Sequence, residues 1–279
     1  TNKNNGAAKA FEIGEYLIDD YADTKMVNKA IEQLDELSKK EQPFFMALGF
    51  LKPHLPFNAP KKYWDLYNEK DVELASNRFQ PENAPDESMH KYGELRKYTN
   101  IPSDFNVDVP DTTQKKLIHG YYACVSYIDA EIGKLIKHLK KIDIYENSII
   151  VLWGDHGWQL GEHNLWAKHC NYQTSLKVPL LIKYPEQKKQ KRINTVVELL
   201  DIYPTLCDLS NIKKPKHLQG KSLLSINNSD PKNLYGYSKY HRGETVTSID
   251  KSYTEWRMKD NNFKADMMYD LLKDPNENI

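Results

Sequence analysis

Apolar side chains recur every three or four residues in three stretches of the chain, the spacing that places them on one face of a helix. The first helix is expected over about 24–41, with the polar pair Asp23-Thr24 as a cap at its start. A longer helix opens at Pro110 and runs for roughly eight turns. A third is expected over about 197–209. Amphipathic helices of this kind have to lie along a sheet or another helix.

Short continuous apolar runs mark strands that are buried on both faces. Such runs cover 44–50, 148–153 and 178–184. Between the first of them and the long helix, residues 70–110 show little periodicity, which indicates a functional loop rather than a tether. Strands that alternate with helices predict an α/β fold with a mixed sheet flanked by helices.

The last part of the chain has short β-prone runs in place of helical spacing. Residues 245–249 and 252–257 are β-prone runs around a short turn, which reads as a hairpin, and 267–271 would add a third strand. We therefore expect an α/β core over 1–212 and a small antiparallel C-terminal subdomain over 213–279.

Composition narrows the class of protein. In 279 residues, 39 Lys and Arg balance 39 Asp and Glu, so there is no overall charge for nucleic acid or an anionic membrane. No stretch approaches the roughly 18 consecutive apolar residues of a membrane span. Three cysteines, Cys124, Cys170 and Cys207, are odd in number and lack C-x-x-C spacing, so neither a disulfide framework nor a zinc ribbon is indicated. We expect a folded globular protein with neither a nucleic-acid partner nor a membrane span.

The dipeptide Asp155-His156 lies between two glycines directly after an apolar run. In open α/β sheets ligands collect at the carboxyl ends of strands. A carboxylate and an imidazole together suggest a metal, with zinc or manganese favoured on general grounds over calcium, which usually takes oxygen ligands alone. The alternative is a turn in which Asp155 accepts bonds from backbone amides and His156 fills space.

A second candidate is His54, which lies in the stiff segment Lys-Pro-His-Leu-Pro-Phe. Each proline fixes its own φ and restricts the residue before it. Near neutral pH a histidine can donate a proton to a leaving oxygen, and the neighbouring Lys52 supplies positive charge for an anion. A rigid surface turn with an ordinary histidine explains the same residues.

The loop that follows the metal candidate is dense in aromatic and charged residues. Trp158 and Lys168 make a plausible pocket for an anionic sugar, with charge for the anion and an aromatic face for the ring. His163 is a further candidate contact. Against this, His163 and Trp166 would serve equally to pack the loop onto the body.

Taken together, three segments resemble the sulfatase family of the alkaline phosphatase superfamily, and most closely its iduronate-2-sulfatase-like branch. They are 43–57 with its Lys-Pro-His-Leu-Pro-Phe, 154–168 with Gly-Asp-His-Gly-Trp and Trp-Ala-Lys, and 253–278 with Tyr-Thr-Glu-Trp-Arg and Asp-Pro-Asn-Glu-Asn. The resemblance runs from about residue 20 to the end, and it implies an alkaline-phosphatase-like fold.

The resemblance also implies a site. Calcium, with zinc or manganese as alternatives, would be held partly by Asp155 and His156. His54 would assist departure of the sugar oxygen, and Lys168 would contact sulfate oxygens. The remaining candidate substrate contacts are Trp158, His163 and Lys52.

The sequence departs from the family in one respect. The family's nucleophile is a formylglycine made from a Cys or Ser in a C/S-x-P/A-S-R motif, and none of the three cysteines has that pattern. The family's Asp-Asp pair of metal ligands also has no counterpart. We therefore expect these residues to be the C-terminal two-thirds of a sulfatase, with the formylglycine on the missing N-terminal segment. Alone they should bind metal poorly and turn nothing over.

The resulting hypothesis is hydrolysis of a sulfate ester, a 2-O-sulfated uronic acid of a glycosaminoglycan or algal polysaccharide, by a periplasmic or secreted enzyme. Its partners would be the sulfated saccharide and the missing N-terminal segment. Two alternatives stay open: a metal-dependent phosphodiesterase or phosphonate hydrolase of the same superfamily, and a non-catalytic sulfatase remnant that binds glycans.

Overall fold

The computed structural model describes residues 8–185, 187, 189–226 and 234–279. They form two compact units, each described here by itself. The first unit comprises the described residues up to Ser76 together with Lys91–Ser148, and the second comprises Asn77–His90 together with the described residues from Ile149 onward. A boundary at 212/213 falls inside the second unit and stays a prediction.

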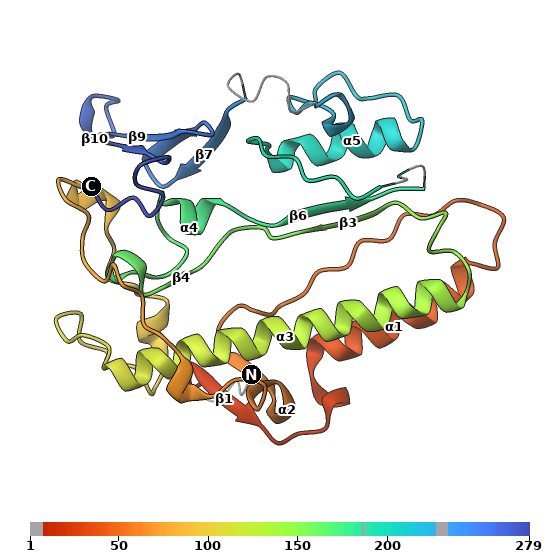
Figure 1. The fold of residues 1–279 in the computed structure, drawn as a ribbon, viewed down its shortest axis with the longest axis horizontal. Coiled ribbons are helices and arrows are strands. Elements are labelled where there is room, and N and C mark those ends of the chain that lie inside the picture. The colour runs from red at the N-terminus through yellow and green to blue at the C-terminus, as the bar shows by residue number, and fades with distance from the viewer. Residues whose placement is uncertain (1–7, 186, 188, 227–233) are drawn as a thin grey trace. The chain divides into compact units, whose positions relative to one another are not determined.

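Two long helices dominate the first unit and lie side by side (Figure 1). They are α1 (Ala22–Leu37) and α3 (Asp111–Lys141), which confirms both predicted helices. The expected cap at the start of α1 is wrong, because the helix begins after Tyr21 and the carboxylate of Asp23 accepts a hydrogen bond from the distant Leu51 amide instead.

A short parallel pair of strands packs on α3 in the same unit. Strand β1 (Phe11–Gly14) pairs with β2 (Phe57–Pro60), which leads into the single-turn helix α2 (Lys61–Trp64). Gly120 of α3 allows the close approach, because a Cβ there would lie 2.9 Å from Cβ of Phe57. The segment that precedes β2 carries His54, so this packing fixes one end of that segment.

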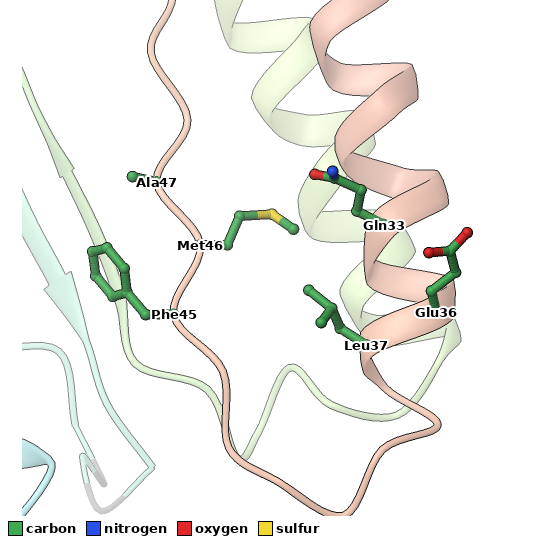
Figure 2. A pocket seen from close by; sticks show the side chains of 6 residues that line it. All are labelled: Gln33, Glu36, Leu37, Phe45, Met46 and Ala47. Atoms are coloured by element: carbon green, nitrogen blue, oxygen red, sulfur yellow. The ribbon is translucent and has the colours of Figure 1, made fainter.

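Residues 44–50 were expected to form a buried strand, and that prediction is wrong. The segment is extended but joins no ladder among the described residues, and Phe45 is 81% exposed. Figure 2 shows a pocket between this segment and the end of α1, with Met46 directed toward the helix and Phe45 away from it. Its lining residues are Gln33, Glu36, Leu37, Phe45, Met46 and Ala47. An apolar run needs partner strands before it can be buried, and the described residues of this unit do not supply them.

Two other predicted strands form an antiparallel pair in the second unit. Strand β3 (Ile150–Trp153) pairs with β6 (Leu180–Lys183). Their existence is confirmed, but burial on both faces is wrong, since Trp153 is 47% and Leu181 57% exposed. The helix expected over 197–209 is confirmed as the turn η6 (Leu199–Asp201) followed by α5 (Ile202–Leu209).

The C-terminal sheet is antiparallel and has four strands in the order β10-β9-β8-β7. They are β7 (Gly236–Tyr240), β8 (Gly243–Thr247), β9 (Lys251–Arg257) and β10 (Phe263–Asp270). The predicted hairpin and third strand are confirmed, while β7 was not foreseen. One face of the sheet packs into a buried apolar cluster of Leu165, Cys170, Tyr172, Trp256, Met267 and Tyr269.

The remaining elements are short. They are β4 (Gln159–Leu160), β5 (Trp166–Ala167), α4 (Gln173–Leu176), and the 3-10 turns η1 (Ile18–Asp20), η2 (Glu69–Asp71), η3 (Asp86–Ser88), η4 (Leu95–Lys97), η5 (Glu162–Asn164) and η7 (Leu223–Ser225). The irregular loop expected over 70–110 is thus confirmed, with three such turns inside or at its edge. Across the described part of the chain, no helix combines the length and the apolar character that crossing a bilayer would require.

Candidate active site

The predicted site residues fall into two groups, one in each unit. The first unit holds Lys52 and His54, and the second holds the candidates from Asp155 to Lys168. Each group is built from local backbone geometry and can be described without the other.

The His54 side chain is held at both of its ring nitrogens. Nδ1 lies 2.8 Å from the carbonyl oxygen of Leu55, and Nε2 lies 3.0 Å from Oε1 of Glu94. The side chain keeps 39% of its surface exposed. Because a carbonyl and a carboxylate both accept hydrogen bonds, the two ring nitrogens face acceptors. This pairing orients the ring.

Glu94 was missed by sequence reasoning. It lies forty residues further along the chain, just before η4 and inside the irregular loop. A lone glutamate in such a loop carries no local signal, since its pairing depends on where the tertiary fold brings the loop.

Lys52 does not point outward to meet a substrate. Its Nζ donates to the carbonyl oxygens of Pro56 at 2.7 Å and His54 at 3.2 Å, two positions in its own segment. Burial lowers the pKa of its ammonium group. This arrangement favours a role inside the protein over the substrate contact that the sequence suggested.

The Asp155-His156 turn comes directly after β3. Gly157 permits it, because a Cβ there would lie 2.0 Å from the carbonyl oxygen of Thr174 in α4, and the Gly157 amide donates to the carbonyl oxygen of Ser175 at 2.8 Å. The Asp155 side chain is 86% exposed and the His156 side chain 32% exposed. The turn therefore presents both side chains to solvent with its backbone anchored on α4.

The two side chains fit a shared cation. Nδ1 of His156 lies 2.8 Å from the Gly157 carbonyl oxygen, an acceptor, so the neutral ring with its hydrogen on Nδ1 has a lone pair on Nε2. Nε2 lies 3.6 Å from Oδ2 of Asp155, and in that neutral form the two atoms are both acceptors. Ligands about 2.3 Å from one ion and at right angles lie roughly 3.3 Å apart. The described residues include no group of three or more His, Cys, Asp or Glu that could complete such a site.

Lys168 reaches the neighbourhood of this turn through a two-stranded ladder. In the β4–β5 pair Gln159 lies opposite Ala167, so the next positions outward, Trp158 and Lys168, are also neighbours. Nζ of Lys168 lies 5.0 Å from the centre of the Trp158 ring, a cation–π distance. The Trp158 ring in turn lies 6.0 Å from the His156 ring.

Trp158 was expected to stack on a sugar, but its position favours a supporting role. Only 8% of the residue is exposed, and its ring contacts are with Lys168 and His156. The indole of Trp158 therefore packs against the ammonium group of Lys168 and near the imidazole of His156. Little of its own surface stays accessible to a sugar ring.

His163 is buried, with 1% of its surface exposed. Nε2 lies 2.9 Å from the carbonyl oxygen of Asn276, and the ring lies 4.2 Å from the ring of Tyr172. Burial lowers the pKa of this histidine. These contacts match the packing role that the sequence left open for His163.

All three cysteines are buried. Burial raises the pKa of the Cys124 thiol to about 12 and also raises that of Cys170. Because the thiolate is the reactive form of cysteine, neither of these two residues is suited to act as a nucleophile at neutral pH.

Comparison with known proteins places the chain in a family. The family model described as "Sulfatase" matches residues 2–212, and one described as "N-sulphoglucosamine sulphohydrolase, C-terminal" matches residues 161–279. The chain belongs to the sulfatase family, within the alkaline phosphatase superfamily.

Two curated relatives show how much of a sulfatase these residues represent. A protein named "Sulfatase" from Formosa agariphila is 34% identical over 257 residues, which cover 91% of this chain and 49% of that protein. Human iduronate 2-sulfatase is 26% identical over 306 residues, which cover 84% of this chain and 56% of that enzyme. The chain thus spans about half the length of these relatives, less than the two-thirds that the sequence suggested.

Solved structures confirm the fold. A protein solved in complex with its substrate D-glucosamine-2-N,6-O-disulfate matches 92% of this chain and 64% of its own length, with a TM-score of 0.74 and 21% identity. A phosphonate monoester hydrolase from Silicibacter pomeroyi matches 91% and 55%, with a TM-score of 0.75 and 20% identity. At these identities the likeness establishes the alkaline-phosphatase-like α/β fold with a small C-terminal antiparallel sheet, and not the reaction.

Proposed function

We propose that the protein to which these residues belong hydrolyses sulfate esters of a sulfated sugar. The observation that carries the proposal is the group in the second unit, where two facing acceptors of Asp155 and His156 suit a cation and the ammonium of Lys168 is held close by on Trp158. A sulfate monoester carries one negative charge. Fixed positive charge at its oxygens stabilises the charge that shifts during bond cleavage.

Each candidate residue then has a chemical role. His54 donates a proton to the departing sugar oxygen, and Lys168 binds a sulfate oxygen. Asp155 and His156 would supply two ligands to calcium, or alternatively to zinc or manganese, and the bound metal would polarise the sulfur–oxygen bonds. The nucleophile, a formylglycine in the family, would come from outside these residues.

The substrate we favour is a 2-O-sulfated uronic acid at the end of a glycosaminoglycan or algal polysaccharide chain. The similarity to human iduronate 2-sulfatase supports this choice, and the structural neighbour bound to a sulfated glucosamine supports a sulfated sugar more broadly. A polymeric, highly charged substrate does not cross membranes, so we propose a periplasmic or secreted location.

One alternative activity has an observation in its favour. The phosphonate monoester hydrolase shares the fold with a TM-score of 0.75, as high as that of the sulfated-sugar enzyme. A phosphonate ester is also a tetrahedral anion that a cation and a lysine would hold. Hydrolysis of a phosphonate monoester is therefore the second candidate.

The test is a substrate comparison with the full-length protein. A disaccharide with a 2-O-sulfated uronic acid should be desulfated faster than one with a 6-O-sulfated glucosamine, and both faster than a phosphonate monoester is cleaved. Preference for the phosphonate would establish the alternative. Binding of the sulfated saccharide with no hydrolysis of any of the three would favour a glycan-binding remnant.

The same assay tests the residues. Changing His54→Ala or Lys168→Ala should lower kcat/KM for the sulfated disaccharide at least about tenfold, or about 1.4 kcal/mol. The exposed residues His217 and Lys259 offer matched controls, and His217→Ala and Lys259→Ala should leave kcat/KM unchanged. Unchanged rates in the first two variants would remove both residues from the mechanism.

A further inference from the structure

Two ionisable side chains, those of Asp23 and Lys52, form hydrogen bonds to the backbone of the segment that carries His54. Asp23, in the first turn of α1, is 2% exposed, and its Oδ1 accepts a hydrogen bond of 2.7 Å from the Leu51 amide. Lys52 donates to the carbonyl oxygens of Pro56 and His54. Burial raises the pKa of Asp23, and the positive charge of Lys52 opposes that rise. The two charges therefore hold the segment at its start and along its length.

The bonds of Lys52 surround the carbonyl that orients the histidine ring. Nδ1 of His54 bonds the carbonyl oxygen of Leu55. Lys52 holds the carbonyls on either side of Leu55, those of His54 and Pro56, at 3.2 and 2.7 Å. Fixing the peptides before and after Leu55 fixes the direction of the Leu55 carbonyl, and with it the plane of the imidazole.

A proton donor needs this kind of support. Catalytic groups have to stay within about 0.5 Å of the productive position, and a misplacement of about 1 Å can cost a hundredfold in rate. The segment is a turn outside any helix or ladder, with backbone hydrogen bonds from the His54 amide to the carbonyl oxygen of Leu51 at 3.1 Å and from the Asn58 amide to that of Pro56 at 2.9 Å. The ammonium group of Lys52 adds two further bonds to this turn.

We infer that Lys52 is a positioning residue for His54. Lys52 affects cleavage of the sulfate ester through the histidine and does not contact the substrate. The inference rests on the proposed function for the role of His54. A lysine that contacted the anion would have its ammonium free to reach it, whereas here the ammonium is directed at the backbone of its own segment.

A double-mutant cycle in the full-length protein separates positioning from substrate contact. Lys52→Met removes the ammonium and keeps the length of the side chain. It should lower kcat for the sulfated disaccharide about tenfold and change KM less than about twofold. In a His54→Ala background the same change should have less than about a twofold effect, because the group that Lys52 positions is gone. Equal losses in both backgrounds, or a rise in KM without a fall in kcat, would overturn the inference.

The leaving group provides a second readout. Proton donation matters most for a poor leaving group such as a sugar alkoxide and little for 4-nitrophenolate. Lys52→Met should therefore slow the disaccharide more than it slows 4-nitrophenyl sulfate, by at least about fivefold, and Lys52→Arg should recover part of the loss. An equal effect on the two substrates would contradict the inference. Lys61→Met, which removes an exposed lysine paired with Asp65 at 2.5 Å, is the matched control and should change neither rate.

A measurement that does not depend on activity tests the positioning role of Lys52 separately from the proposed hydrolysis of sulfate esters. Nitrogen-15 NMR of the histidine rings should show one fixed hydrogen-bonded arrangement for His54 in the wild type and averaged signals in Lys52→Met, or in Lys52→Gln if the first variant does not fold. Identical His54 signals in wild type and variant would refute the positioning role. Failure of the wild type to hydrolyse any sulfate ester would refute the proposed function and leave the NMR result to be read by itself.

Discussion

The two groups of site residues are built in opposite ways. Around His54 the ring has acceptors at both nitrogens and Lys52 is bonded to its own segment. At Asp155 the carboxylate is 86% exposed and faces Nε2 of His156. The first arrangement is complete without a ligand and suits a group that has to keep its orientation. The second leaves a carboxylate oxygen and an imidazole nitrogen 3.6 Å apart at the surface, a pair that suits a shared cation.

The groups also differ in what supports them. The His54 segment depends on a few bonds from Asp23 and Lys52. The Asp155 turn is bonded to α4 through the Gly157 amide, and Gln173 of α4 donates in turn to Thr247 of the C-terminal sheet. Glu277 accepts a hydrogen bond of 2.7 Å from the amide of Gln173, the first residue of α4, and is 2% exposed. This buried carboxyl group therefore stabilises the start of α4, the helix to which the Asp155 turn is bonded.

The largest effect is expected at the exposed acceptor pair. Asp155→Ala removes one of the two facing acceptors, so it should weaken calcium binding at least about tenfold and lower kcat/KM at least about a hundredfold. Isothermal titration of the full-length protein with calcium, followed by the activity assay, checks both. Asp129→Ala, at an exposed position of α3, is the control. Calcium affinity equal to that of the wild type would mean that the two facing acceptors do not share a metal.

A second effect is expected on the free energy of unfolding, through Glu277. Burial raises the pKa of its carboxyl group to about 7, above the ordinary value of 4.5. Between these two pH values the folded state binds more protons than the unfolded state, so the free energy of unfolding falls as the pH rises from about 4.5 to about 7 and this contribution is constant above. At about 1.4 kcal/mol per pKa unit, the loss should be roughly 3 kcal/mol.

Glu277→Gln keeps an oxygen acceptor for the Gln173 amide and removes the titration. The difference in unfolding free energy between wild type and variant, measured with urea at several pH values, should therefore decrease across that window and then level off. A difference that stays flat from pH 4.5 to 8 would show that the carboxyl group ionises as readily in the folded protein as in the unfolded chain.

The smallest effect is expected at the pair formed by His54 and Glu94. Glu94→Gln removes the charge that faces Nε2 of His54 and keeps a side-chain oxygen, so it should lower kcat/KM roughly threefold to tenfold, or about 1 kcal/mol. Steady-state kinetics on the sulfated disaccharide measure it. Glu87→Gln, which breaks an ion pair of 2.7 Å with Lys264, is the control. A loss as large as that of His54→Ala would mean that Glu94 itself takes part in proton transfer.

Some elements of the fold can be predicted from the local pattern of the sequence, and others cannot. The long helix from Pro110 and the hairpin near 250 were found because their spacing and turns are local properties of the chain. The run at 44–50 has the same apolar character as a buried strand, yet Phe45 is exposed, because burial of a strand depends on neighbours that the pattern does not contain.

The candidate chemistry divides along the same line. Local pattern was sufficient to predict the helices, the C-terminal hairpin, the sulfatase motifs and the pairing of Asp155 with His156, since these depend on residues close together in the chain. Long-range packing directs Lys52 inward, brings Glu94 to His54, and buries Trp158 and His163. The reason is physical: a side chain's burial and partners depend on which distant segments pack against it, and hydrogen bonds across forty or a hundred residues leave no local trace in the order of the amino acids.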